Sequence, residues 1–272
     1  MAVHAHPDDE ATSTGGILAR YASEGIRTVL VTCTDGACGD APGGIKPGEA
    51  GHDDQAVIDL RAEELRASCA ILGVEHLELL GYGDSGMMGW PHNDTPGSFW
   101  STPIEESASR LGALMEAYRP EVVVTYDANG FYGHPDHIQA HRITMAAAST
   151  TGIPAKVYWT TVPHSGWVAF AQRMREAGME MPTGEPDSAG SGEPLPVIGS
   201  PDEDIDAWID VRPYADAKFD ALAAHASQTD NIFFLRMGRE VFTELMGGET
   251  FIRAVDRTGA PVPENDLFAG LR

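Results

Sequence analysis

The sequence predicts an α/β protein with three layers, in which helices cover both faces of a mostly parallel sheet. Two runs, residues 28–33 and 122–126, are almost continuously apolar and β-branched, as strands buried in a parallel sheet are. Segments with helical periodicity separate the predicted strands, and this alternation favours crossover connections. In addition, a strand, a polar turn and a helix follow one another at residues 2–23 and again at residues 122–149.

The first half of the chain alternates strands, helices and two long loops. We expect strands at residues 2–4, 28–33 and 77–80, and helices at residues 11–23 and 54–72. In the second helix, the apolar residues expected inside are Leu60, Leu65 and Ile71, and the charged residues are Arg61, Glu64 and Arg66. Residues 34–51 and 81–100 are rich in Gly, Pro and Asp and predict long loops, which are often functional.

The second half continues this alternation and then becomes mixed. We expect helices at residues 104–118, 138–149, 166–177, 213–226 and 240–246, strands at 122–126, 157–161, 205–211 and 249–255, and a loop at 182–204. The strand at 205–211 alternates apolar and acidic residues, which suits the edge of a sheet. We therefore predict one domain over residues 1–272, with a core at 1–165 and a smaller mixed cap at 166–272.

Composition excludes several classes of partner. The chain has 272 residues, 18 Lys plus Arg and 41 Asp plus Glu, which gives a formal net charge of −23. Nucleic-acid binding needs a basic footprint that this chain lacks, and docking on anionic membranes is disfavoured for the same reason. The charge itself indicates a solvated acidic surface and says little about the substrate.

Cysteine usage and hydropathy bear on the compartment. The chain has three cysteines, Cys33, Cys38 and Cys69, with no CxxC spacing, which fits a reducing cytoplasm and no disulfide framework. No apolar run approaches membrane-spanning length and no signal peptide is visible. Because the first strand starts abruptly at Ala2, the sequence leaves open an upstream start with a targeting segment.

Two polar motifs follow predicted strands. The first, at residues 4–10, reads His-Ala-His-Pro-Asp-Asp-Glu, and the second, at residues 133–137, reads Gly-His-Pro-Asp-His. The carboxyl ends of parallel strands share one edge of the sheet, where open α/β folds bind their ligands. Imidazoles and carboxylates together suit a borderline divalent metal such as zinc. We therefore expect the two motifs to meet in one metal-centred hydrolytic site.

A zinc hydrolase needs three protein ligands and an open position for water. His6 and Asp9 can supply two ligands and His137 the third, which leaves Asp8 beside the metal to take a proton from water. Without the second motif, His6 and Asp9 would be read as a helix cap beside a surface histidine. Iron can compete with zinc for such a site.

The second motif also offers groups that act on the substrate. His134 lies on the same turn as His137 and can protonate a leaving amine, and Asp136 can orient an imidazole and stabilise its charged form. Tyr132 can donate a hydrogen bond to a developing oxyanion, although packing under its loop is the alternative. His4 is expected to be packed or hydrogen-bonded rather than a ligand.

These two motifs, His6-Pro7-Asp8-Asp9 and His134-Pro135-Asp136-His137, resemble those of the LmbE-like, or PIG-L, family of zinc-dependent N-deacetylases. The resemblance covers most of the chain and is strongest up to about residue 150. It implies that His6, Asp9 and His137 bind zinc, that Asp8 is the base, and that His134 is the acid or electrostatic stabiliser. It also implies a Rossmann-like sheet without a nucleotide cofactor, and the chain has no GxGxxG after its first strand.

The loop at residues 81–89 resembles a branch that includes N-acetylglucosaminyl-inositol deacetylases and mycothiol S-conjugate amidases. The resemblance implies that Asp84 and Met87 contact the substrate and that Arg61 contacts its polar head. The alternatives are a loop-structuring Asp84, a core Met87 and a solvated Arg61. Residues 35–40 lack the family's frequent acidic pair, and residues 182–204 fall in a variable region, so the sequence does not fix the substrate.

We therefore predict a zinc-dependent hydrolase that removes an acetyl group from an N-acetylglucosamine-containing glycoconjugate, a small molecule. The enzymatic alternatives are a mycothiol S-conjugate amidase and a deacetylase or deacylase of an antibiotic glycoside. A metal- or sugar-binding protein is the non-enzymatic alternative, but it would not need the spare base Asp8 and the spare acid His134. The oligomeric state does not follow from the sequence.

Overall fold

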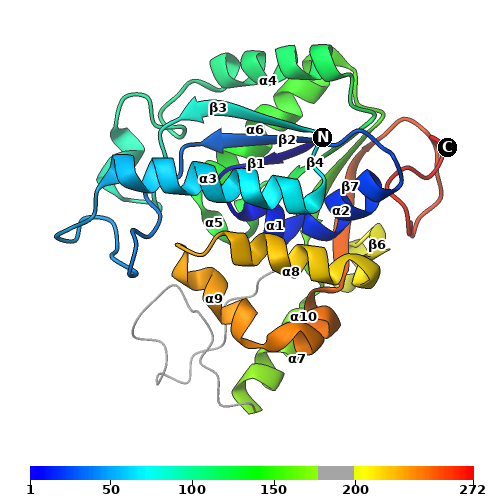
Figure 1. Cartoon of the computed structure of the whole chain (residues 1–272). Helices are drawn as coiled ribbons and strands as arrows, with labels where there is room; N and C mark the ends of the chain where they lie inside the picture. Colours follow the sequence, from blue (N-terminus) through cyan, green and yellow to red (C-terminus); the bar gives the residue numbers. More distant parts are fainter. Residues whose placement is uncertain (177–198) are drawn as a thin grey trace.

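The computed structural model describes residues 1–176 and 199–272, and a seven-stranded sheet organises them (Figure 1). The strands are β1 (Ala2–His4), β2 (Val29–Thr34), β3 (His76–Tyr82), β4 (Val122–Tyr126), β5 (Lys156–Thr161), β6 (Ala207–Asp210) and β7 (Gly248–Asp256). Their order across the sheet is β3-β2-β1-β4-β5-β7-β6. The five strands from β3 to β5 are parallel, whereas β7 and β6 pair antiparallel. The mostly parallel α/β architecture predicted from the sequence is confirmed.

The strand order reverses between β1 and β4. From β1 the chain runs outward through β2 to β3, then returns to the other side of β1 and continues through β4 to β5. Neighbouring connections therefore leave the sheet in opposite directions at this point, which opens a crevice at the carboxyl ends of the two strands. The first polar motif follows β1 and the second follows β4, so both lie at this crevice.

Helices cover both faces of the sheet and complete three layers (Figure 1). They are α1 (Asp9–Ser13), α2 (Gly15–Ser23), α3 (Asp54–Leu72), α4 (Ile104–Tyr118), α5 (Gly130–Gly133), α6 (Pro135–Thr151), α7 (His164–Glu176), α8 (Ala215–Ala224), α9 (Thr229–Arg236) and α10 (Gly238–Met246). Short 3-10 turns are η1 (Pro91–Asp94), η3 (Asp202–Asp204) and η4 (Arg212–Tyr214). Helices α4 and α6 pack on one face, and α2, α3 and α8 pack on the other.

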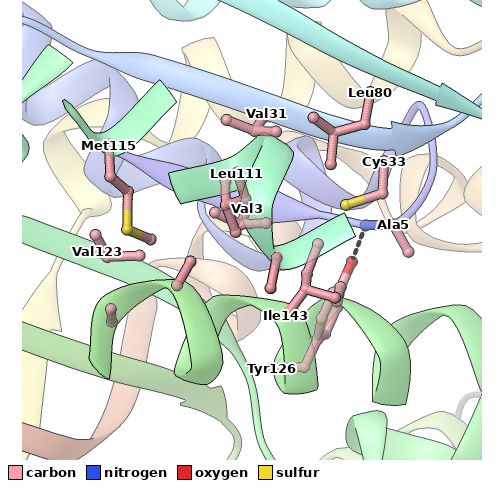
Figure 2. Packing of buried hydrophobic residues seen from close by; sticks show 14 of the residues in the cluster. Val3, Ala5, Val31, Cys33, Leu80, Leu111, Met115, Val123, Tyr126 and Ile143 are labelled. Atoms are coloured by element: carbon pink, nitrogen blue, oxygen red, sulfur yellow. Dashed lines mark hydrogen bonds between the residues drawn. The ribbon is translucent and has the colours of Figure 1, made fainter. Parts of the chain in front are cut away.

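The core follows from the alternation of side chains along the central strands. Val3 of β1 points to the face covered by α4 and α6, where it joins Leu111 and Ile143 (Figure 2). Its neighbour Ala2 points to the opposite face and packs with Leu65 of α3. Both faces of the central strands are therefore buried, which explains their nearly continuous apolar sequence.

The predicted first helix is two helices. Thr14 has φ −138° and separates α1 from α2, and the new helix starts where Glu249 of β7 accepts the amide hydrogens of Gly16 and Ile17 at 2.8 and 2.9 Å. A carboxylate at a helix N-terminus satisfies amide groups that have no partner within the helix. This contact spans more than 230 residues of sequence, so local periodicity could not predict it.

Helix α3 has the predicted bounds, but Ile71, expected inside, is 41% exposed, so the prediction for this side chain was wrong. Two charged side chains of the helix are buried: Arg61 and Glu64 are 4% and 8% exposed. Glu64 accepts hydrogen bonds from the amide and hydroxyl of Ser227 at 2.8 and 2.7 Å. Segments distant in sequence thus supply the polar partners that these charged side chains need inside the fold.

The other predicted elements agree with the structure in their main features. Helix α4 and strand β4 have the predicted bounds, β3 extends to Tyr82, and the loop that follows contains the short turn η1. The strand predicted at the sheet edge is β6, which lies at the edge beside β7. The last two strands of the expected mixed C-terminal part thus join the main sheet. Most of the predicted loop at 182–204 lies outside the described residues.

Two further findings concern the helices and the cysteines. Within residues 1–176 and 199–272, no helix is long and apolar enough to cross a membrane. Cys33, Cys38 and Cys69 are all free thiols.

Candidate active site

The crevice between β1 and β4 brings the two polar motifs together, as the sequence predicted. The imidazole of His6, from the first motif, lies with ring centroids 4.5 Å from His134 and 5.3 Å from His137 of the second motif. All three rings are buried. One nitrogen from each imidazole can be chosen so that the three lie within 4.8 Å of one another.

Asp9 lies between the imidazoles of the two motifs. Its Oδ2 is 3.4 Å from Nδ1 of His6, and its Oδ1 is 3.5 Å from Nε2 of His137. Metal–ligand bonds of about 2.0–2.1 Å in a tetrahedral site place two donor atoms roughly 3.3 Å apart. Each of these two distances is close to that spacing, but they involve different oxygens of Asp9. Among the described residues, the sets whose donor atoms all lie within 4.8 Å of one another are His6 with His134 and His137, and His6 with Asp84 and Asp136. The ligand set His6, Asp9 and His137 therefore stays a prediction.

The electrostatics of this cluster also fit a bound cation. Burial acts to lower the pKa of His6, but Asp84, Asp136 and Asp9 outweigh it and raise that pKa well above its usual value. The carboxylates thus favour a positive charge at this point, which a divalent ion would supply. Burial lowers the pKa of His137 to about 4, so this ring is neutral at physiological pH, as an imidazole that binds a metal must be. Its Nε2 is buried and has no hydrogen-bond partner among the described residues.

Asp8 lies beside the cluster and contacts none of the three imidazoles. Its Oδ1 is 3.3 Å from Nη2 of Arg61, and its Oδ2 accepts a hydrogen bond from Asn231 at 3.3 Å. Burial, with a contribution from the adjacent Asp9, raises the pKa of Asp8 to about 6 against the opposing charge of Arg61. A carboxylate that has a raised pKa, lies next to a metal site and contacts none of its imidazoles has the properties of a general base.

The structure turns Arg61 toward Asp8. Besides this ion pair, its guanidinium donates to the carbonyl oxygens of Gly36 at 2.8 Å and Pro7 at 2.5 Å. Arg61 is therefore not a solvated helix charge. Its predicted contact with the polar head of a substrate stays a prediction.

Two aspartates orient His6. Oδ2 of Asp136 lies 3.2 Å from Nε2 of His6 and accepts the amide of Ser85 at 2.9 Å. Asp84 lies 3.6 Å from the same nitrogen, and its oxygens accept the amides of Cys38 and Gly86 at 3.2 and 2.8 Å. Asp136 therefore has the imidazole-orienting position predicted for it. Asp84 structures its loop beside the metal cluster, and its substrate contact stays a prediction.

The remaining predicted residues are Tyr132, Met87 and His134. Tyr132 is 49% exposed, and its ring centroid lies 5.2 Å from that of His137. Met87 is 40% exposed and so is not a core residue. Nδ1 of His134 accepts the amide of Asp136 at 3.1 Å, and burial together with His6 and His137 lowers the pKa of His134 to about 2. The neutral His134 ring therefore carries its proton on Nε2, as a hydrogen-bond donor.

Sequence reasoning missed several residues that build the site. Tyr126, the last residue of β4, donates to Oδ2 of Asp9 at 2.7 Å, accepts the amide of Ala5 at 2.9 Å (Figure 2), and stacks on His137. Asn231 comes from the C-terminal part and reaches Asp8. His225 reaches Glu10, and it was not without a signal, because residues 225–228 resemble a late segment that borders the site in the family with these two motifs. Tyr126 ends an apolar strand directly before the second motif, and this position was the only signal for it in the sequence.

His4 and His141, two other histidines near the motifs, have structural partners. Nε2 of His4 lies 2.8 Å from the hydroxyl of Thr14, and Nδ1 of His4 lies 3.2 Å from that of Tyr126. The prediction that His4 is a hydrogen-bonded core residue agrees with these contacts. His141 lies 2.9 Å from the carbonyl oxygen of Tyr126.

An open α/β sheet with imidazoles and carboxylates converging at its switch point, and one further carboxylate beside them, defines a class of hydrolytic enzymes that use a metal ion. The chain belongs to the PIG-L family, whose description is GlcNAc-PI de-N-acetylase and which matches residues 1–148. The chain is also 42% identical over its full length to the 1D-myo-inositol 2-acetamido-2-deoxy-alpha-D-glucopyranoside deacetylase of Salinispora arenicola, covering 91% of that protein. The protein is accordingly a deacetylase, a hydrolase of a non-peptide amide bond.

Solved structures share the fold at low identity. N,N'-diacetylchitobiose deacetylase from Pyrococcus horikoshii superposes with a TM-score of 0.58 at 17% identity, over 93% of this chain and 82% of that one. The 4-carboxy-2-hydroxymuconate hydratase GalB from Pseudomonas putida superposes with a TM-score of 0.57 at 17% identity, over 96% and 97% of the two chains. Since a hydratase and a deacetylase match almost equally, the fold alone does not identify the reaction.

Proposed function

We propose that this protein removes the N-acetyl group from an N-acetylglucosamine-containing glycoconjugate in the cytoplasm, with Zn²⁺ held by His6, Asp9 and His137. The observation that carries the proposal is that the two adjacent aspartates of the first motif have different partners. The Asp9 carboxylate faces the imidazoles of His6 and His137, whereas the Asp8 carboxylate contacts Arg61 and Asn231. The full-length similarity to 1D-myo-inositol 2-acetamido-2-deoxy-alpha-D-glucopyranoside deacetylases supports the N-acetylglucosaminyl inositol as substrate. The three free thiols are consistent with a reducing compartment.

Zn²⁺ bound in this site would lower the pKa of a water molecule and polarise the amide carbonyl. Asp8 takes the proton from the attacking water, because it is the carboxylate that no imidazole occupies. Its raised pKa, about 6, brings its basicity closer to neutral pH and so makes proton transfer more favourable than for an ordinary aspartate. Asp136 holds the ring of His6, so that Nδ1 of His6 faces Asp9.

The second motif supplies the groups that stabilise the transition state. His134, neutral with its proton on Nε2, donates a hydrogen bond and so fits the electrostatic role better than that of a cationic acid. Tyr132 donates to the developing oxyanion from the exposed rim of the site. Arg61 holds Asp8, and Met87 at the rim contacts the glycoconjugate beyond the reacting sugar.

The experiment that tests this function is a substrate panel on protein loaded with zinc. Primary amine released is measured with N-acetylglucosamine, its inositol glycoside and a mycothiol S-conjugate. We expect the inositol glycoside to be hydrolysed with the highest kcat/KM. Preferential hydrolysis of the S-conjugate would identify a conjugate amidase instead, and no release from any amide would leave a metal-binding protein. A parallel assay on protein loaded anaerobically with Fe²⁺ compares the two metals.

A further inference from the structure

Glu10, the last residue of the first motif, is fully buried and has three hydrogen-bond partners. Its Oε2 accepts the backbone amide of Asp8 at 3.0 Å. Its Oε1 accepts the hydroxyl of Ser68 at 2.5 Å and Nε2 of His225 at 2.7 Å. Ser68 lies on α3 and His225 follows α8, and both are fully buried. A buried carboxylate with this many partners is fixed in one place.

The backbone of Asp8 needs such support. Asp8 has φ 127° and ψ −23°, a positive φ that residues other than glycine rarely adopt. Backbone strain of this kind persists only where surrounding contacts impose it, and it occurs most often at functional sites. The Glu10 carboxylate reaches back to the amide of the residue that precedes α1, as the glutamate of a capping box does.

The unusual backbone decides where the Asp8 side chain points. Its two oxygens contact Arg61 and Asn231, whereas the next residue, Asp9, turns toward the imidazoles of His6 and His137. Two adjacent aspartates thus face different partners. A relaxation of φ at Asp8 would rotate its carboxylate away from Arg61.

We propose that Glu10, anchored by Ser68 and His225, is a positioning residue that holds the strained backbone of Asp8 and thereby aims the Asp8 carboxylate at the reacting water. This inference rests on the proposed role of Asp8 as general base. On this proposal the C-terminal part of the chain contributes to catalysis, because it supplies His225, which holds Glu10 from 215 residues away in the sequence.

The chain contains a matched control. Glu249 is also a buried glutamate that bonds a buried side-chain nitrogen, since it pairs with Lys218 at 2.7 Å, and it also accepts backbone amides, those of Gly16 and Ile17. It contacts none of the proposed catalytic residues. Substitution of Glu249 therefore measures the effect on folding of removing a buried carboxylate and its partners.

The test measures kcat, KM and zinc content of Glu10→Gln, Glu10→Ala and Glu249→Gln with the inositol glycoside. We expect Glu10→Gln to lower kcat about tenfold and Glu10→Ala about a hundredfold, as small misplacements of catalytic groups do. KM and zinc per chain should stay within about twofold, and so should kcat of folded Glu249→Gln. Equal losses in Glu10→Gln and Glu249→Gln, or a fall in zinc content that matches the fall in kcat, would overturn the proposal.

A double substitution separates positioning from a general structural role. In an Asp8→Asn background, Glu10→Gln should lower kcat no further, because no base remains to be aimed. A further tenfold loss would show that Glu10 acts on something other than Asp8. If Asp8→Asn itself keeps normal turnover, the proposed base is wrong. If Asp8→Asn is inactive while Glu10→Gln equals Glu249→Gln, only the positioning role fails.

A crystal structure of Glu10→Gln adds a readout that does not depend on activity. We expect φ of Asp8 to shift from its positive value and the contact between Asp8 and Arg61 to lengthen. An unchanged Asp8 backbone in that variant would contradict the proposal. Should Glu10→Ala fail to fold, Glu10→Gln and His225→Gln carry the test, since both keep a polar side chain of similar size.

Discussion

The two strand–helix junctions of the site, β1–α1 and β4–α6, have the same local order but are held very differently. At the first junction, Asp8, Asp9 and Glu10 each have partners from distant segments: Arg61, Tyr126 and His225 among them. At the second junction, Tyr132 is half exposed and Nε2 of His137 is buried without a hydrogen-bond partner in the described structure. The first junction is saturated with contacts, and the second leaves a nitrogen of His137 without a hydrogen-bond partner among the described residues.

This difference indicates a division of labour. On the proposed function, the saturated junction would pre-organise the base Asp8 and one side of the metal site before any ligand binds, which lowers the cost of reaching the reactive geometry. The open junction would keep the imidazole of His137 for the metal. Backbone strain occurs at both junctions, at Asp8 with φ 127° and at Phe131 with φ 66°, just before Tyr132.

The largest effect should come from the open junction through its metal ligand. We expect His137→Ala to lose bound zinc and all measurable turnover, because the ligand set falls to two. Metal analysis by plasma mass spectrometry, together with the amine-release assay, checks this. His141→Ala is the control, since His141 bonds only a backbone carbonyl, and it should keep its zinc. Full zinc occupancy in His137→Ala would require a different ligand set, with His134 as the next candidate.

The saturated junction should show a large loss of rate without loss of metal. Asp8→Asn removes the base but keeps the shape of the side chain, and we expect kcat to fall by about 10²–10⁴-fold. Zinc content and KM should stay near those of the unsubstituted protein. The measurement is steady-state kinetics on metal-replete protein. Near-normal turnover of Asp8→Asn would contradict the assignment of Asp8 as the general base.

Loss of a single donor at the rim should cost less. Tyr132→Phe keeps the ring beside His137 and removes only the hydroxyl, so we expect kcat to fall by about 10²-fold, roughly 3 kcal/mol of transition-state stabilisation. Stability should not change, because the side chain is half exposed. A Tm equal to that of the unsubstituted protein, with the expected drop in kcat, supports the role. An unchanged kcat would mean that Tyr132 only covers the site.

The smallest effect should appear in the pH profile. Asp8 accepts a proton only when ionised, and its raised pKa, about 6, means that this form is lost as the pH falls through that value. A bound cation lowers the pKa of a nearby carboxyl, so we expect the acidic limb of kcat/KM between about pH 4 and 6. Below it, kcat/KM should fall about tenfold per pH unit. If the residual activity of Asp8→Asn shows the same acidic fall in kcat/KM, that fall reports the titration of a group other than Asp8.

The sequence by itself determined the layered architecture and the composition of the site. Val122–Tyr126 is buried on both faces and could form only an interior strand, and the helix Asp54–Leu72 is delimited by Asp53 at its start and Gly73 at its end. The paired motifs predicted that His6, Asp9, His134 and His137 would meet, and they do. These features depend on local propensity and on the rule that parallel strands end at one edge.

Only the tertiary structure decided which polar side chains of the helices and of the C-terminal part turn inward. Arg61 and Ile71 lie on one helix with an ordinary apolar pattern, and the partners that bury Arg61 come from other segments. Glu10 had no role that the sequence could assign, because His225 meets it across 215 residues. A buried charge is stable only where its partners are placed, and that placement belongs to the folded chain as a whole.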